Sequence, residues 1–432
     1  MDTIFALASG AGKAGVAIVR ISGPSSKEIS QKLSGSHLPE PRVASLRNVI
    51  SGGGQKLDKA VYLRFEEGQS FTGEDVLELH LHGSQAVIES VLKELDSFED
   101  TRLAKPGEFT RRALENGRLD LSQVDGLADL INAQTEAQQR QALRILDGRL
   151  SSAVTQWRSN LVRAAALIQA NIDFSDEEIP DNLRPEIIEL ISQTRDSLLK
   201  EIEGYAASKL IRSGFEVAII GEPNIGKSTL LNYLAGRDAA LTSQTAGTTR
   251  DVIEVNMDVA GYSVTFLDTA GIRDADDPIE KLGIERGLQR AEDADCRVIL
   301  IPQSDAVIPI EPRSGDLVYV AKQDEPSADR GFSGISGVSG YGVDDLLAVL
   351  SERLNMAAGN SSLLIRERYR ASMNEAVVGL TSALDEIDLG MERIEIVAEE
   401  LRAATYALDS MLGKVGVEDV LDEVFSSFCL GK

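Results

Sequence analysis

The chain has 432 residues, of which 43% are hydrophobic, and its formal net charge at pH 7 is −25. This charge excludes a broad basic face that grips nucleic acid by replacing its counterions, so an RNA substrate would require a local basic patch or a basic partner protein. The two cysteines, Cys296 and Cys429, make no disulfide framework, and no stretch approaches the ~18 apolar residues of a membrane helix, so we expect a cytoplasmic protein with no membrane segment.

The first part of the chain, residues 1–117, is predicted to form an α+β domain. Short β-type runs at residues 16–21 and 76–81 are separated by glycine- and serine-rich turns such as residues 51–54. From residue 118 to residue 210 the apolar spacing becomes helical, for example along Leu121, Val124 and Ala128. We therefore expect a helical domain to begin near residue 118.

Between residues 211 and 357 strands alternate with helical stretches, an order typical of a parallel sheet with crossover helices. Helical spacing returns in residues 358–432. A helix bundle that is interrupted by an inserted α/β domain explains both facts, because insertion is tolerated where the entry and exit points lie close together. The predicted fold class is thus multidomain α+β and α/β, with a discontinuous helical bundle.

The most informative motif lies inside this α/β segment. Residues 221–228 read Gly-Glu-Pro-Asn-Ile-Gly-Lys-Ser, which matches the phosphate-loop pattern G-x-x-x-x-G-K-[ST], between an apolar run and a helix-like segment. A strand, a glycine turn and a helix in this order direct backbone N–H groups and the positive helix end at phosphate oxygens. We expect Lys227 to hold the β- and γ-phosphates and the Ser228 hydroxyl to bind Mg²⁺.

Two further motifs follow in the order found in GTPases. Residues 245–251 read Thr-Ala-Gly-Thr-Thr-Arg-Asp, and a predicted strand at 264–267 runs into Asp268-Thr-Ala-Gly. In such a site Asp268 reaches Mg²⁺ through water and the Gly271 N–H meets the γ-phosphate. The inserted domain therefore resembles a Ras-like P-loop GTPase.

The base-binding segment departs from the usual pattern. After a predicted strand at 317–320, residues 321–324 read Ala-Lys-Gln-Asp where GTPases normally have Asn-Lys-x-Asp. Asp324 keeps the carboxylate that accepts guanine N–H groups, but Ala321 replaces the bracing Asn, which we expect to cost about 1–3 kcal/mol of binding without loss of specificity. Ser336 and Gly337 resemble the usual Ser-Ala-Lys loop with glycine in the alanine position, which predicts a second weakening of this pocket.

Hydrolysis must also proceed differently from that of the small signalling GTPases. Ile272 follows the D-x-x-G motif where those enzymes have a water-orienting glutamine, and an aliphatic side chain cannot orient water. Asn224 in the phosphate loop offers an amide oxygen through which a monovalent cation can stabilise charge. The alternative is that Asn224 only braces the loop.

With these motifs in place, the whole chain resembles the MnmE family of tRNA uridine-modification GTPases, also called TrmE. The glycine-threonine segment and the Phe-Cys-Leu-Gly-Lys ending are the most diagnostic parts, because few other GTPases carry either. The resemblance lies in residues 2–4, 20–23, 71–75, 82–83, 106–110, 116–121, 171–174, 247–251 and 428–432.

The resemblance implies that G domains dimerise across the nucleotides and that this contact activates GTP hydrolysis. It assigns Mg²⁺ to Ser228 and Thr249, a K⁺ ion to Asn224, Ser243, Thr245 and Thr248, and the orienting of water to Glu280. Without the resemblance Glu280 is a solvated glutamate at a helix start. The implied nucleotide-binding set is Asn224, Ile225, Gly226, Lys227, Ser228, Thr229, Ser243, Gln244, Thr245, Ala246, Gly247, Thr248, Thr249, Asp268, Thr269, Ala270, Gly271, Lys322, Asp324, Ser336 and Gly337.

The resemblance further implies that the N-terminal domain makes the protein a homodimer and binds 5-formyltetrahydrofolate or a related one-carbon folate. The folate contacts map onto Arg20, Glu78, Arg118 and Lys432, where Arg118 replaces the usual lysine and changes the donor geometry. Cys429 is a candidate reactive thiol, and the alternative is a buried cysteine on an apolar helix face.

The family acts with a flavin- and NADH-dependent partner, MnmG or GidA, which forms a hetero-oligomer with it. Together they place an aminomethyl-type group, such as carboxymethylaminomethyl, on carbon 5 of wobble uridines in certain tRNAs.

Two other functions stay open: a switch GTPase of ribosome assembly without folate chemistry, and a folate-dependent methyl-group transferase with a decayed G domain. Binding of a reduced folate and K⁺-stimulated GTP turnover distinguish the three. His80 and His82 share a predicted strand face, but the only other histidine is His37, so we expect no metal site there.

Overall fold

The computed structural model describes residues 2–173, 183–237, 240–241, 254–268, 289, 292–306, 308, 310–311, 313–326, 332–359, 361–390, 393–415, 421, 424–425, 428 and 431. It divides into two compact units, one made of Met1–Ala128, Ser151–Thr155 and Leu408–Lys432 and the other of Asp129–Leu150 and Gln156–Ala407. The predicted fold class is confirmed, because a mixed sheet, a helix bundle and a mostly parallel sheet are all present. The domain boundaries near residues 117, 210 and 357 stay predictions.

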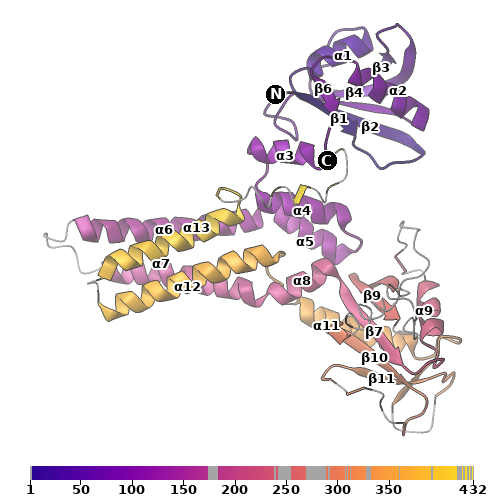
Figure 1. Ribbon diagram of the computed structural model, residues 1–432, viewed down its shortest axis with the longest axis vertical. Helices are drawn as coiled ribbons and strands as arrows, with labels where there is room; N and C mark the ends of the chain where they lie inside the picture. The colour runs from indigo at the N-terminus through magenta and orange to yellow at the C-terminus, as the bar shows by residue number, and fades with distance from the viewer. Residues whose placement is uncertain are drawn as a thin grey trace, which may run out of the picture. The chain divides into compact units, whose positions relative to one another are not determined.

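The first unit is built on a six-stranded sheet with the strand order β3-β4-β5-β2-β1-β6 (Figure 1). Neighbouring strands are antiparallel except β1 and β6, which are parallel. The predicted strands at 16–21 and 76–81 are confirmed. The strands are β1 (Thr3–Leu7), β2 (Ala14–Ser22), β3 (Ser45–Ile50), β4 (Lys56–Phe65), β5 (Val76–Gly83) and β6 (Thr101–Leu103).

Helices α1 (Ser26–Ser34) and α2 (Gln85–Asp96) pack on one face of this sheet, where they bury Val19 and Leu79 in a common core. Because side chains alternate along a strand, the neighbours of these core residues point to the other face. That face receives α3 (Glu108–Glu115) through Phe109. This second face therefore also carries Arg20 of β2 and Glu78 of β5, which are paired in the sheet.

Helix α4 (Leu121–Asn132) begins the predicted helical region. Leu121 and Val124 of α4 pack with Val424, Phe425 and Phe428 from the last part of the chain. The helical spacing predicted for these two segments thus marks two halves of one apolar cluster.

The sheet of the second unit has the order β12-β11-β10-β7-β9-β8, in which only β8 runs antiparallel to its neighbour. Helices α9 (Lys227–Ala235) and α11 (Val343–Ala358) bury Leu231 and Leu346 in the larger core of this sheet. Ile299, Ile301 and Val320 form a smaller apolar cluster of their own. The strands are β7 (Phe215–Gly221), β8 (Glu254–Val259), β9 (Tyr262–Asp268), β10 (Cys296–Ile301), β11 (Leu317–Ala321) and β12 (Ser333–Ile335).

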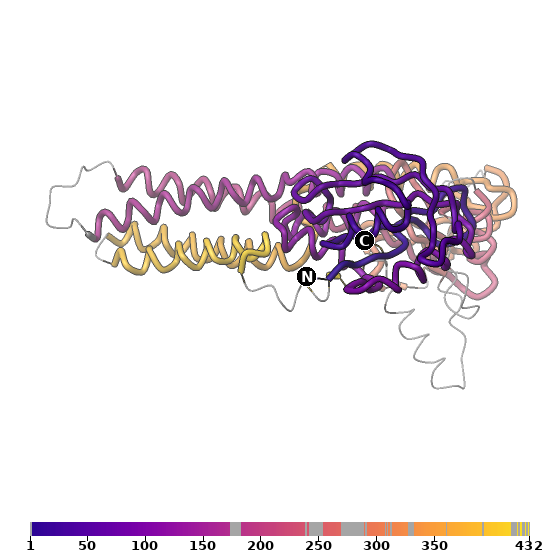
Figure 2. The backbone as a smooth tube through the Cα atoms, turned by 90° about the horizontal axis from the view of Figure 1, so that it is seen from above, coloured from indigo at the N-terminus to yellow at the C-terminus, as the bar shows by residue number. Residues whose placement is uncertain are grey.

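The remaining helices of the second unit come before and after this sheet in the sequence. Helix α12 returns after the sheet to pack along α7, and the Arg184 side chain donates a hydrogen bond to the Ile387 carbonyl at 2.8 Å. Figures 1 and 2 show α6, α7, α12 and α13 side by side, which is the discontinuous bundle expected from the sequence. None of the helices in the described ranges combines the length and apolarity that a membrane crossing requires. These helices are α5 (Glu136–Leu146), α6 (Arg149–Asp173), α7 (Leu183–Glu203), α8 (Tyr205–Ser213), α12 (Glu367–Leu389) and α13 (Ile394–Met411).

Candidate nucleotide and folate sites

The predicted nucleotide motifs gather at one edge of the sheet in the second unit. Four parallel strands end there, at Gly221, Asp268, Ala321 and Ile335. The register places Ala321 beside Ile335, and it places Asp268 beside Ile219, near the end of β7. Ligands of open α/β sheets bind outside the carboxyl ends of the strands, so this edge is where a nucleotide site is expected.

Lys227 is the charged centre of the phosphate end of this site. It is the first residue of α9 and is only 4% exposed. Its ammonium donates hydrogen bonds to the carbonyls of Gly221 at 2.5 Å and Glu222 at 2.9 Å. Burial lowers the pKa of Lys227, and the charge of Asp268 only partly offsets this. A phosphate beside the ammonium would supply the anionic partner that its buried charge favours.

The backbone of the loop before α9 is bent in the manner that phosphate binding requires. Asn224 and Gly226 have positive φ angles of 62° and 118°. Glycine at position 226 fits because it adopts this angle without strain, and Asn is the kind of side chain that tolerates it best. Gly226 caps α9 without a side-chain hydrogen bond, so the first amides of the helix are left for an anion. Ile225 anchors the loop in the core.

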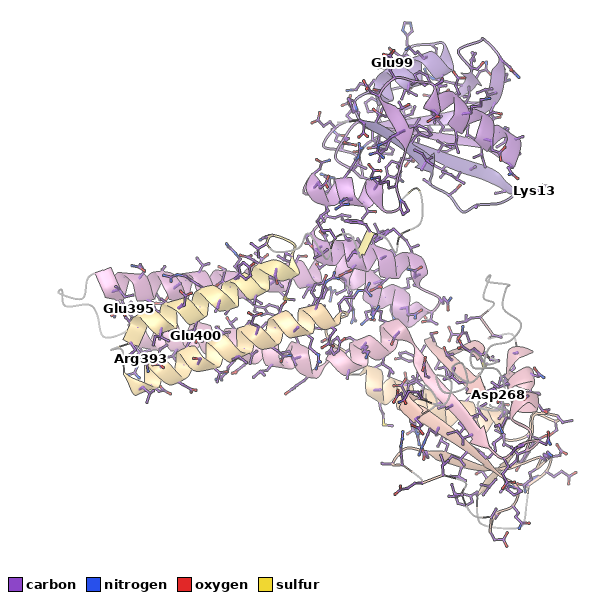
Figure 3. All side chains as sticks on the ribbon, in the orientation of Figure 1. Lys13, Glu99, Asp268, Arg393, Glu395 and Glu400 are labelled. Carbon is purple, nitrogen blue, oxygen red and sulfur yellow. The ribbon has the colours of Figure 1, made fainter. Side chains whose placement is uncertain are left out.

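Ser228 and Asp268 form the candidate Mg²⁺ end of the site. The Ser228 hydroxyl donates to Asp268 Oδ2 at 2.8 Å, and Asp268 is 3% exposed at the end of β9. Figure 3 labels Asp268 at this edge of the sheet. A hydroxyl and a carboxylate at this spacing are oxygen ligands of the kind Mg²⁺ prefers, directly or through water. Both residues therefore fit the role predicted for them.

A cavity of about 250 Å³ forms the candidate base pocket next to the phosphate loop. The Ser339 hydroxyl donates to Asp324 Oδ1 at 2.8 Å, and hydrogen bonds from Ser336 and Ser339 hold the pKa of Asp324 below its usual value. An ionised carboxylate in this position is the acceptor that guanine N–H groups require. The cavity is lined by Ile225, Gly226, Thr229, Leu230, Leu300, Ala321, Lys322, Asp324, Ile335, Ser336, Gly337 and Val338.

Gly337 lies against the first turn of α9 more closely than any other residue type would permit. A Cβ atom at this position would be 2.5 Å from the Leu230 nitrogen and 2.6 Å from the Thr229 carbonyl carbon. These are backbone atoms, which cannot rotate away as a side chain can. The glycine that the sequence comparison with other GTPases marks as a weakness is thus required by local packing.

The candidate folate residues of the first unit include one directly bonded pair. Arg20 and Glu78 are opposite each other on β2 and β5, and the Arg20 Nε donates to Glu78 Oε1 at 3.0 Å. The Arg20 guanidinium also lies over two aromatic rings, 5.4 Å from the centre of Phe71 and 5.7 Å from that of Phe109. A carboxylate, a guanidinium and two aromatic rings are thus gathered on the face of the sheet that α1 and α2 leave to α3.

Arg118 reaches the same loop from another direction. Its aliphatic chain lies beside Gly73, so that a Cβ at Gly73 would be 3.3 Å from Arg118 Cγ. Gly73 is two residues from Phe71, which contacts Arg20. The loop at 71–75, singled out in the sequence, therefore contacts two of the predicted folate residues.

Part of the predicted site lies outside the described residues. Residues 243–249 and 269–271 of the nucleotide set are in this group, and so are Glu280, Cys429 and Lys432. Their roles in K⁺ binding, Mg²⁺ binding, water orientation, thiol chemistry and folate binding stay predictions.

Sequence reasoning missed some residues that complete these sites. Ser339 positions Asp324 through its hydroxyl. His80 lies beside the folate pair, with its Nε2 3.6 Å from Glu78 Oε2. The alternation of β5 carried a signal for His80, since it shares a strand face with Glu78. No sequence signal distinguished Ser339 from any other loop serine.

The fold and these contacts define a P-loop GTP-binding protein with an additional α+β domain. Family models match the chain over residues 121–429, described as the MnmE helical domain, and over residues 3–118, described as the N-terminus of the GTP-binding protein TrmE. The chain belongs to the MnmE family of tRNA modification GTPases.

Curated relatives align with the chain from end to end. Proteins named tRNA modification GTPase MnmE from Cereibacter sphaeroides strain ATCC 17025 and from Ruegeria sp. strain TM1040 are each 50% identical over 432 residues, which is 100% of both chains. The relative of the same name from Paracoccus denitrificans is 44% identical over 436 residues, again with 100% of both chains covered. A crystal structure of Aquifex aeolicus Era is 23% identical to this chain. The alignment covers 38% of this chain and 66% of the Era chain, with a TM-score of 0.25.

Proposed function

We propose that this protein hydrolyses GTP and, with a flavin-dependent partner, uses a one-carbon folate to add an aminomethyl-type group, such as carboxymethylaminomethyl, to C5 of wobble uridines in certain tRNAs. The observation that carries the GTPase part is the meeting of three groups at one sheet edge. These are the buried ammonium of Lys227, the hydrogen-bonded pair of Ser228 and Asp268, and the ionised carboxylate of Asp324. Together they provide partners for the phosphates, the Mg²⁺ ion and the base.

Hydrolysis in this proposal is activated when two G domains meet in the presence of K⁺. The exposed Asn224 is held in a left-handed conformation at the phosphate loop, which suits an amide that binds a cation beside the phosphates. The ion would supply positive charge where other GTPases use an arginine. Glu280 is proposed to orient the attacking water, because Ile272 cannot.

The first unit offers a suitable environment for the folate. Glu78 can accept N–H groups of a pterin ring, and Arg20 and Arg118 can bind anionic groups of the folate. The buried Nε2 atom of His80 makes no hydrogen bond within the described part of the chain. Since buried polar atoms rarely lack a partner, this atom supports a bound polar molecule beside Glu78.

The acidic charge of the chain supports a scheme in which the partner protein, more than this chain, binds the RNA. A protein with a net charge of −25 gains little from long-range attraction to RNA, so the partner would supply much of the RNA grip together with the redox chemistry. Homodimerisation through the N-terminal domain and a cytoplasmic location belong to the same proposal.

Mass spectrometry of tRNA nucleosides tests the proposal directly. Cells from which this gene is deleted should lose the modified wobble uridine and regain it with the wild-type gene. Asp268→Asn should fail to restore it, because the Mg²⁺ end of the site would lose a charge. Arg402→Gln is the matched control, since it removes one charge from an arginine that is 65% exposed on α13. Unchanged wobble uridines in the deleted cells would refute the proposed function.

A further inference from the structure

A second cavity, of about 170 Å³, lies where the sheet of the second unit meets its helices. Helices α5 and α8 and the start of β9, which Figure 1 shows close together, line it with the end of α11 and the segment that follows. Its lining is Ala137, Arg140, Gln141, Arg144, Ile145, Ile211, Tyr262, Ala358, Ser361, Ser362 and Leu363. None of these residues belongs to the nucleotide or folate sets.

The polar part of this lining is made of hydrogen-bond donors. Arg140 and Arg144 are one helical turn apart on α5, and both are exposed. Arg140 is paired with Glu136 at 2.9 Å, but with side chains 59% and 69% exposed such a pair is weak. Within the described residues, no acceptor pairs with the Arg144 guanidinium. Two exposed guanidinium groups are therefore ready to bind an anion at the cavity.

Neighbouring groups add donors and positive charge. Gln141 donates one of its two amide hydrogens to the Ser208 carbonyl at 3.1 Å, and Ser361 contributes a hydroxyl. Helix α8 carries Lys209 and Arg212 and no acidic residue. Carboxylates at this lining include Glu136, which pairs with Arg140, and Glu201, which accepts the Leu363 amide at 2.7 Å. Guanidinium groups and hydroxyls together are suited to phosphate oxygens.

We propose that this cavity binds a backbone phosphate of the tRNA, an inference that rests on the proposed function for the identity of the RNA. The arginine pair gives the acidic protein the local patch that an RNA contact requires. Phosphate contacts position an RNA without reading its sequence, so the patch serves all tRNA substrates alike.

The position of the cavity links this contact to the nucleotide site. Tyr262 is both part of the lining and the first residue of β9, whose last residue is Asp268. The amide of Ala137, in the first turn of α5, donates to the carbonyl of Gly261 in the adjoining turn at 3.1 Å. A phosphate bound to the α5 arginines thus lies against the strand that carries the Mg²⁺ carboxylate.

Binding of tRNA to the full-length protein across about 50–200 mM KCl tests this site. Replacement of both arginines, Arg140→Gln with Arg144→Gln, should weaken binding roughly three- to tenfold and reduce the slope of log affinity against log salt by about one to two. The control variant Arg163→Gln with Arg402→Gln makes the same change in charge on α6 and α13, at side chains 60% and 65% exposed. It should bind within about twofold of the wild type and keep the salt slope.

Several outcomes overturn the phosphate site. They are an unchanged salt slope in the α5 variant, an equal loss in the control variant, or no measurable tRNA binding by the wild type at about 50 mM KCl. A loss of affinity that accompanies a lower unfolding temperature, with the slope kept, gives the arginines a structural role instead. Cells that carry Arg140→Gln with Arg144→Gln separate this proposal from the proposed tRNA modification. Normal wobble modification together with normal tRNA binding would refute the phosphate site and leave the proposed tRNA modification intact.

Discussion

Replacement of Gly337 by alanine distinguishes two explanations of the base pocket. Comparison with other GTPases suggests that alanine would restore a stronger pocket. The structure predicts the opposite, because the new Cβ would lie 2.5 Å from the Leu230 nitrogen and 2.6 Å from the Leu230 Cα. Real Cβ atoms do not approach backbone this closely, so either the base loop or the first turn of α9 must move.

The cost follows from what those atoms belong to. The first turn of α9 carries Lys227 and Ser228, so a shift there would misplace the groups proposed to bind the phosphates and Mg²⁺. Overpacking of a dense site costs about 1–3 kcal/mol. If all of this strain falls on the bound state, the dissociation constant for GDP rises by about five- to 150-fold. If the strain is already present in the free protein, it appears as a lower unfolding temperature.

Titration of a fluorescent GDP analogue, together with thermal unfolding, measures both effects. Gly236→Ala is the matched control, because Gly236 follows the other end of α9 and its Cβ would lie 3.5 Å from the Asn232 carbonyl oxygen, an ordinary contact. The control should bind GDP and unfold as the wild type does. Unchanged or tighter GDP binding by Gly337→Ala, with an unchanged unfolding temperature, would refute the packing argument.

Three further changes have outcomes that follow from single contacts. Asp316→Asn should lower the free energy of unfolding by about 3–5 kcal/mol in denaturant titration, because Arg297 is paired with Asp316 and both side chains are 6% exposed. Burial alone would raise the pKa of Asp316, but the hydrogen bonds and charge of Arg297 outweigh it and the net pKa is lowered. The contribution of this pair is therefore complete above the unfolded pKa of about 3.9 and is lost as the pH falls through the lower folded pKa, a loss that Asp316→Asn should not show. Asn224→Ala should abolish the stimulation of GTP hydrolysis by K⁺ over Na⁺ while GDP binding persists. Stimulation by K⁺ as strong as in the wild type would exclude a cation role for this amide. Asp324→Asn should lose preference for guanine over xanthine in competition assays, because an amide donates where the carboxylate accepted.

The candidate nucleotide site could be proposed from the sequence because its motifs are local. Residues 221–228 form one strand-to-helix turn, and the conformation that binds phosphate is encoded in their own spacing. Residues 217–220 before them are all apolar because β7 lies between β9 and β10, and residues 217–219 are buried in succession on both faces of the sheet. Local motifs of this kind need no knowledge of the rest of the fold.

The candidate folate pair shows which feature of a site periodicity cannot predict. Arg20 and Glu78 are 58 residues apart and meet only because β2 and β5 pair in one particular register. A shift of one residue in that register would put them on opposite faces of the sheet. Family resemblance pointed to both residues, but only the paired strands explain why they touch. The close approach of Gly337 to α9 is of the same kind, since it depends on how a loop and a helix pack.

The two ends of β9 contact two different parts of the second unit, the candidate nucleotide site and helix α5. This seven-residue strand is hydrogen-bonded to β7 on one side and β8 on the other, so a continuous stretch of paired backbone joins its two ends. At one end Asp268 bonds to Ser228, and at the other the turn through Gly261 accepts the first-turn amide of α5. Any change in the coordination of Asp268 that displaces the strand is therefore felt at α5, which is outside the sheet. If GTP binding displaces β9, linkage requires that a ligand which favours one position of α5 change the affinity for GTP by the same factor.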